Sequence, residues 1–99
     1  MPRFYIGAFY FTMDANWLKN FREKLDNHYA WPALYTFKFI VRSGTEEQLL
    51  ALFSNHVPSQ KASKNGNYTS ITYSMMMPSS DAVIEVYQAA STIEGIIAL

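Results

Sequence analysis

The alternation of apolar and polar residues predicts two long strands, over residues 34–41 and 68–77. In both segments the odd positions are apolar: Tyr35, Phe37, Phe39, Val41, Ile71, Tyr73, Met75 and Met77. Because successive side chains of a strand point to opposite faces, each strand should bury its odd side in a core. The even side then stays open, and it collects Thr36, Lys38, Ile40, Ser70, Thr72, Ser74 and Met76.

Apolar residues at intervals of three and four predict a first helix before these strands. The residues that recur at this helical spacing are Trp17, Leu18, Phe21, Leu25 and His28. Asp14 stands at the N-cap position, where its carboxylate would accept a hydrogen bond from a free backbone amide of the first turn. Trp31-Pro32 should end the helix, since the residue before a proline is pushed out of the helical region.

Two further helices are predicted, one after each of the two strands. Thr45 and Gln48 match a capping box, and the stripe that follows is Leu49, Leu52, Phe53 and Val57. The segment at residues 78–81 reads as a turn and a helix start, and the apolar positions after it are Val83, Val86, Tyr87 and Ala90. This last helix should stop near Thr92.

Two shorter segments complete the pattern. Residues 59–64 are polar and lead into Asn65-Gly66, a strong signal for a two-residue hairpin of type I′, in which both central residues need positive φ. After a turn at Glu94-Gly95, the apolar residues 96–99 fit a last strand. Residues 33–99 therefore read β-α-β-β-α-β.

This order predicts an α+β fold of the ferredoxin-like split βαβ type, with two helices on one face of an antiparallel four-stranded sheet, preceded by a short N-terminal helix. Residues 14–99 should form one domain, and residues 1–13 an N-terminal extension. The aromatic run at residues 4–11 has three interpretations: a short strand, a brief signal peptide without a cleavage site, or an upstream extension with Met13 as the true start.

Composition narrows the class of protein. The 99 residues carry eight Lys+Arg and eight Asp+Glu, a net charge of zero, which gives no bulk positive field for nucleic acid or anionic membranes. No stretch approaches the ~20 apolar residues of a membrane-spanning helix. With no cysteine there is neither a disulfide nor a thiolate nucleophile, and a cytoplasmic location fits.

Few residues suggest catalysis or metal binding. His28 and His56 have no second ligand at metal-site spacing, so we expect neither a metal nor another cofactor. Ser79-Ser80 reads as a helix cap, and Glu46-Glu47 as acids that complement a helix N-terminus. We therefore do not expect an enzyme.

The open side of the sheet offers the only candidate binding residues that the pattern itself selects. Lys38 and, if the hairpin register holds, Lys61 lie among the hydroxyls of Thr36, Ser70 and Thr72, which suits a small anion. Solvated or edge-protecting lysines are the alternative explanation. RNA recognition on the same topology needs aromatic residues on the central strands, and Tyr68 stands alone at a strand start.

Two segments resemble a known family. Trp31-Pro32-x-x-Tyr35-Thr36-Phe37-Lys38 and the run Ser-Lys-Asn-Gly-Asn-Tyr-Thr-Ser-Ile-Thr at residues 63–72 are similar to the YbeD-like family of small bacterial proteins, domain-of-unknown-function family 493. The resemblance covers residues 20–99. It implies a ferredoxin-like fold similar to ACT-type regulatory domains, which bind small effectors, and it implies no catalytic residues. Gly44 occupies the place of the glycine loop that lies at ACT dimer interfaces.

Taken together, these features predict a noncatalytic regulatory or interaction module. Its partner would be a small-molecule effector or another protein, and a homodimer is among the expected assemblies. The alternative is a nucleic-acid-binding module of the same fold. The residues assigned to the ligand site are Lys38, Lys61, Thr36, Ser70, Thr72 and Gly44.

Overall fold

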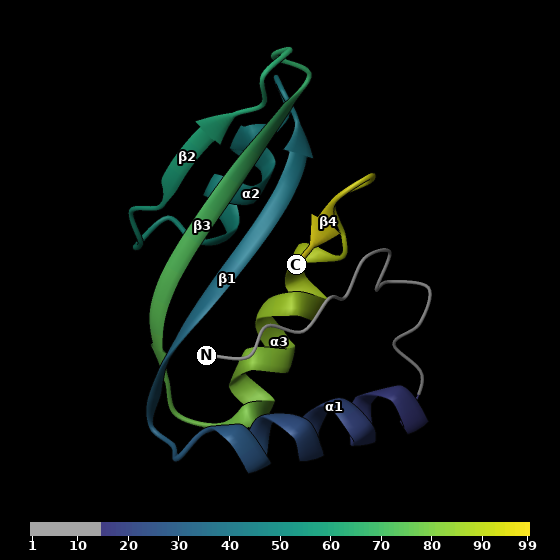
Figure 1. Cartoon of the computed structure of the whole chain (residues 1–99), viewed down its shortest axis with the longest axis vertical. Helices are drawn as coiled ribbons and strands as arrows, with labels where there is room; N and C mark the ends of the chain where they lie inside the picture. Colours follow the sequence, from purple (N-terminus) through teal and green to yellow (C-terminus); the bar gives the residue numbers. More distant parts are fainter. Residues whose placement is uncertain (1–14) are drawn as a thin grey trace.

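The computed structural model describes residues 15–99 (Figure 1). Its elements are α1 (Ala15–His28), β1 (Ala33–Arg42), α2 (Glu46–Leu52), β2 (Ser59–Ala62), β3 (Tyr68–Met77), α3 (Ser80–Ala90) and β4 (Ile97–Ala98). The predicted extension at residues 1–13 and the Asp14 cap lie outside the described residues. None of the helices described is long and apolar enough to cross a membrane.

The four strands form one antiparallel sheet in the order β2-β3-β1-β4. The two long strands are the central neighbours, with Phe37 opposite Tyr73, and the short strands lie outside them. The chain therefore forms a ferredoxin-like sandwich with an additional N-terminal helix, as the element order predicts. α1 packs against α3 at the end of the sheet away from the β2-β3 turn (Figure 1).

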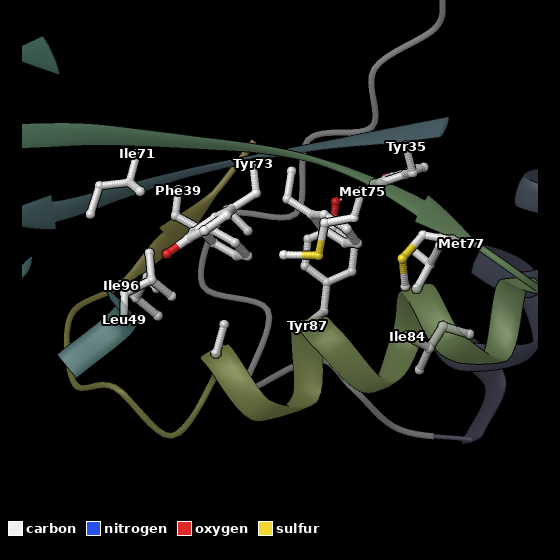
Figure 2. Close-up of a cluster of buried hydrophobic side chains, with 14 of the residues drawn as sticks. Tyr35, Phe39, Leu49, Ile71, Tyr73, Met75, Met77, Ile84, Tyr87 and Ile96 are labelled. Atoms are coloured by element: carbon white, nitrogen blue, oxygen red, sulfur yellow. Dashed lines mark hydrogen bonds between the residues drawn. The ribbon is translucent and has the colours of Figure 1, made fainter. Parts of the chain in front are cut away.

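The core lies between the odd face of the sheet and the helices. The odd positions of β1 from Tyr35 to Val41 and those of β3 from Ile71 to Met77 are all buried, which confirms the predicted alternation. Figure 2 shows Met75 and Met77 pointing from β3 toward α3 while Tyr87 points back from the helix. The Tyr87 ring packs edge-on against Phe37, with ring centroids 5.2 Å apart.

Helix α2 departs from the prediction in its cap and in its length. Thr45 makes no capping bond with its side chain; its Oγ1 donates to the carbonyl oxygen of Arg42 at 2.7 Å. The helix ends at Leu52, so the predicted buried stripe does not continue. Leu49 is buried, but Leu52 is 43% exposed and Val57, which follows the helix in a loop, is 97% exposed.

The β2-β3 turn keeps the predicted register but not the predicted turn type. Lys61 lies opposite Ser70, as a hairpin centred on Asn65-Gly66 requires. Of the two central residues of this turn, only Gly66 has positive φ, at 78°. Asn65 therefore does not take the left-handed conformation of a type I′ turn. The Gly66 amide donates to the Ser63 carbonyl, and the Asn65 Oδ1 accepts from the Asn67 amide at 3.1 Å. The loop of residues 64–67 is longer than the two-residue loop of a type I′ hairpin. It reverses the chain with one left-handed residue, so a second is not needed.

Candidate functional site

The even positions of β1 and β3, with Ser59 and Lys61 of β2, form one sheet face that we call the open face. Residues directly opposite each other in neighbouring strands share a face, so the register sets its composition. One row of this face holds Lys61, Ser70 and Ile40. The neighbouring rows pair Arg42 with Tyr68 and Lys38 with Thr72. Each of these rows therefore places a basic side chain beside a side chain with a hydroxyl group.

A hollow of about 450 Å³ lies on the open face near the β2-β3 turn, and we call it the tip hollow. It is lined by Ile40, Lys61, Ala62, Ser63, Lys64, Tyr68 and Ser70. A second hollow, of about 420 Å³, is also bordered by Tyr68 and is lined in addition by Arg42, Ser43, Gly66 and Asn67. Tyr68 therefore lines both hollows, and this residue is 42% exposed.

Neither hollow has a carboxylate among its lining residues. Glu46 is the first residue of α2, and both oxygens of its carboxylate accept hydrogen bonds from other residues of the chain. Its Oε2 accepts from the Thr69 hydroxyl at 2.7 Å, and its Oε1 accepts from the Gly44 amide at 2.7 Å. The hydrogen bond from Thr69 lowers the pKa of Glu46, with backbone amides adding to the effect. Thr69 lies on the odd, helix-covered side of β3, so this negative charge is held away from the open face.

The structure brings some of the predicted site residues together and separates others. Lys61 and Ser70 both line the tip hollow. Lys38 and Thr72 face each other in the next row. Thr36 lies further away, with its hydroxyl 3.4 Å from that of Ser74. Gly44 lies in the loop before α2, where its amide donates to Glu46, and it lines neither hollow.

Of the residues that line the two hollows, only Lys61 and Ser70 were among the predicted site residues; Lys64, Ile40 and Arg42 are three of those that were missed. Lys64 was assigned only to the hairpin, Ile40 only to the open face, and Arg42 had no assignment. The alternation of β1 does place Ile40 and Arg42 on the same face as Lys38, and this signal could have found them. Lys64 lies in the turn, where no periodicity shows the direction of a side chain.

Metal ligands do not gather in residues 15–99. No group of three or more His, Asp or Glu side chains in this range could hold a metal ion. His28 is at the end of α1, and His56 follows α2. The one buried side-chain hydroxyl without a hydrogen-bond partner in this range belongs to Tyr73, in the core. Desolvation raises the pKa of that phenol.

A family model described as a protein of unknown function, DUF493, matches residues 26–99. The chain belongs to this family. The match includes the whole sheet, α2, α3 and every residue that lines the two hollows, so the open face of this DUF493 protein lies inside the shared domain. No curated protein and no solved structure matches the chain.

Proposed function

We propose that this DUF493 protein is a noncatalytic regulatory or interaction module whose open face binds a small anionic ligand. One observation carries the proposal: Lys61 and Lys64 border the tip hollow, Lys38 lies on the same face, and no carboxylate lines the hollow. The resemblance to ACT-type domains, which bind small effectors, supports the same class of function. The lack of cysteine fits a reducing cytoplasm as its location.

The charge distribution supports an anion as ligand. The net charge of the chain is zero, yet Lys38, Arg42, Lys61 and Lys64 are four of its eight basic residues and belong to the open face and its turn. Two unit charges 4 Å apart attract by only about 1 kcal/mol in water, so one lysine gives little affinity. Lys61 and Lys64 together at one hollow, with the Ser70 hydroxyl beside them, give both attraction and orientation.

The ligand can be sought with a thermal-shift screen of the full chain against pyrophosphate, citrate, sugar phosphates and amino acids, with light scattering to measure the mass of any homodimer. A ligand at 100 times its dissociation constant adds about 2.7 kcal/mol of stability. We expect anions to raise the unfolding midpoint and the Lys61→Gln variant to reduce the shift. Lys19→Gln, which removes an exposed charge from α1, is the matched control.

Two outcomes would contradict the proposal. If none of the anions shifts the midpoint, the open face does not bind this class of ligand. If Lys19→Gln reduces the shift as much as Lys61→Gln does, the attraction comes from overall charge and not from the open face.

A nucleic-acid-binding module is the second candidate, favoured by one observation: exposed Tyr68 lies beside Arg42, Lys61 and Lys64. Against it, the other open-face positions of the central strands hold no further aromatic residue on which bases could stack. We expect single-stranded RNA to bind more weakly than about 1 µM at physiological salt. Tight binding in an anisotropy titration, abolished by Tyr68→Ala, would favour the second candidate.

A further inference from the structure

The lining of the tip hollow combines two kinds of surface. Ile40, Ala62 and Tyr68 are apolar or aromatic residues of the lining, whereas Lys61 and Lys64 are its basic residues. A simple anion would use only the lysines. A ligand that uses the whole lining must have an apolar part, joined to an anionic part.

The tip hollow has the size of a site for a small organic molecule. Its volume of about 450 Å³ lies within the range of about 300–1,000 Å³ that is typical of ligand pockets. A free phosphate ion would leave most of this space filled with water. The hollow is therefore large enough for a ring system and its charged substituent together.

Tyr68 indicates that the apolar part of the ligand is flat. Tyr68 is 42% exposed and lines both hollows, so it is accessible to a ligand in either of them. Tyrosine rings stack on planar aromatic groups, and every nucleobase offers such a face. Ile40, from the neighbouring strand, lines the same hollow and can contact the ring system as well.

The polar groups of the tip hollow suit phosphate and ribose. A lysine side chain attracts phosphate as a point charge, and Lys61 and Lys64 both line the tip hollow. The Ser70 hydroxyl makes only a long hydrogen bond of 3.4 Å to the Lys61 carbonyl, so it can exchange that bond for one to a sugar hydroxyl. The Ser63 hydroxyl, in contrast, is used within the turn by Asn65 and by the Tyr68 amide.

From these features we infer that the tip hollow binds a free nucleotide, with its base against Tyr68 and Ile40 and its phosphates between Lys61 and Lys64. The inference rests on the proposed function, because it names the class of anion that the open face takes. A nucleotide is favoured over a nucleic-acid strand because Tyr68 provides a single stacking position. Arg42, opposite Tyr68 in the next strand, adds a positive charge at the second hollow that Tyr68 also lines.

Calorimetric titration of the full chain with ADP, pyrophosphate and adenosine tests the inference. We expect ADP to bind at least tenfold more tightly than pyrophosphate or adenosine, since it uses both parts of the site. Tyr68→Leu should weaken ADP at least tenfold and leave pyrophosphate unchanged, and Tyr68→Phe should keep the ADP affinity. Lys64→Gln should weaken ADP and pyrophosphate alike. Lys19→Gln is the charge control, and the unfolding midpoint of each variant shows whether it is folded.

The outcomes separate this inference from the proposed function. If pyrophosphate binds as tightly as ADP and Tyr68→Leu changes neither, the open face binds anions but the nucleotide inference is wrong. If no compound binds, both are wrong. If a ten-residue oligothymidine binds more than tenfold more tightly than ADP, the site belongs to a nucleic-acid-binding module and the inference is overturned.

Discussion

The hydroxyl oxygens of Tyr35 and Tyr87 lie 2.9 Å apart and share a hydrogen bond inside the core. Tyr35 belongs to β1 and Tyr87 to α3, so this polar contact joins the sheet to the helix layer (Figure 2). The rings of Phe37 and Phe39 pack around Tyr87, with centroids 5.2 and 6.0 Å from its ring. A hydrogen bond in such surroundings fixes the position of α3 over the sheet more sharply than apolar packing alone.

This contact predicts energetic coupling between Tyr35 and Tyr87. Tyr35→Phe and Tyr87→Phe should each destabilise the protein by about 1 kcal/mol, because each leaves the other hydroxyl without this partner. The double variant should cost less than the two single costs together, with a coupling energy of about 0.5–1.5 kcal/mol. Urea unfolding of the four proteins measures it. Strict additivity would show that the two hydroxyls do not interact.

Tyr73→Phe should have the opposite effect. The Tyr73 hydroxyl is buried and has no hydrogen-bond partner in the part of the chain that is described, and its ring packs on Phe53 with centroids 5.2 Å apart. An unsatisfied buried hydroxyl carries a desolvation cost of about 1–3 kcal/mol, which phenylalanine does not have. We expect the free energy of unfolding to rise by about 1 kcal/mol, as measured by urea unfolding beside Tyr87→Phe. A loss of stability would reveal a partner for this hydroxyl.

The long elements of the fold could be predicted from the sequence because one physical rule governs each of them. The alternation in β1 and β3 reports burial directly, since a slip by one residue would turn Phe37 and Tyr73 away from the core. Two of the predictions that were wrong concern helix ends, where the same residues can form more than one local structure. Thr45 matches a capping box, but its hydroxyl binds the Arg42 carbonyl instead. Val57 has helical spacing, but the helix ends before it.

The candidate site could be predicted only as far as the strand register extends. Lys61 and Ser70 meet because a hairpin centred on Asn65-Gly66 requires that pairing. The tip hollow also needs Lys64, whose direction depends on a loop that closes with one left-handed residue where two were predicted. Gly44 was assigned to the ligand site because of the resemblance to a family with a glycine loop at this position. In the structure its amide donates a hydrogen bond to the Glu46 carboxylate.

Glu46 predicts a pH-dependent contribution to stability. Its pKa is lowered in the folded protein, first by the hydrogen bond from Thr69. A carboxyl with a lowered folded pKa stabilises the protein above its unfolded pKa, about 4.3, and that stabilisation disappears as the pH falls through the folded value. Glu46→Gln should therefore lower the unfolding midpoint at pH 7, and the difference from the unaltered protein should shrink in acid.

The neighbouring acid provides the control for this prediction. Glu47 is exposed and lies in the same first turn of α2, so Glu47→Gln changes the same formal charge at the same helix end. Thermal unfolding between about pH 3 and pH 7 compares the two variants. Equal effects of both substitutions at every pH would mean that the helix end, and not the bonds to Thr69 and Gly44, accounts for the role of Glu46.

Gly66 provides the last prediction, which concerns the turn beside the tip hollow. Its φ of 78° lies in the left-handed region, and a Cβ added there would meet no atom within 4 Å. The cost of a side chain is therefore the backbone strain alone, about 1–2 kcal/mol for Gly66→Ala and more for the β-branched Gly66→Val. Asn67→Ala, in the same turn but without positive φ, should change the stability little.

Gly66→Asn separates strain from other causes, because asparagine tolerates the left-handed region better than alanine does. The free energy of unfolding, from urea denaturation, should therefore fall in the order Gly66, Asn, Ala, Val. The same order should appear in the affinity for pyrophosphate if the turn holds Lys64 at the tip hollow, since a distorted turn moves its side chain. An unchanged midpoint for Gly66→Ala would show that residue 66 is not left-handed in solution, and the register that brings Lys61 to Ser70 would then lose its support.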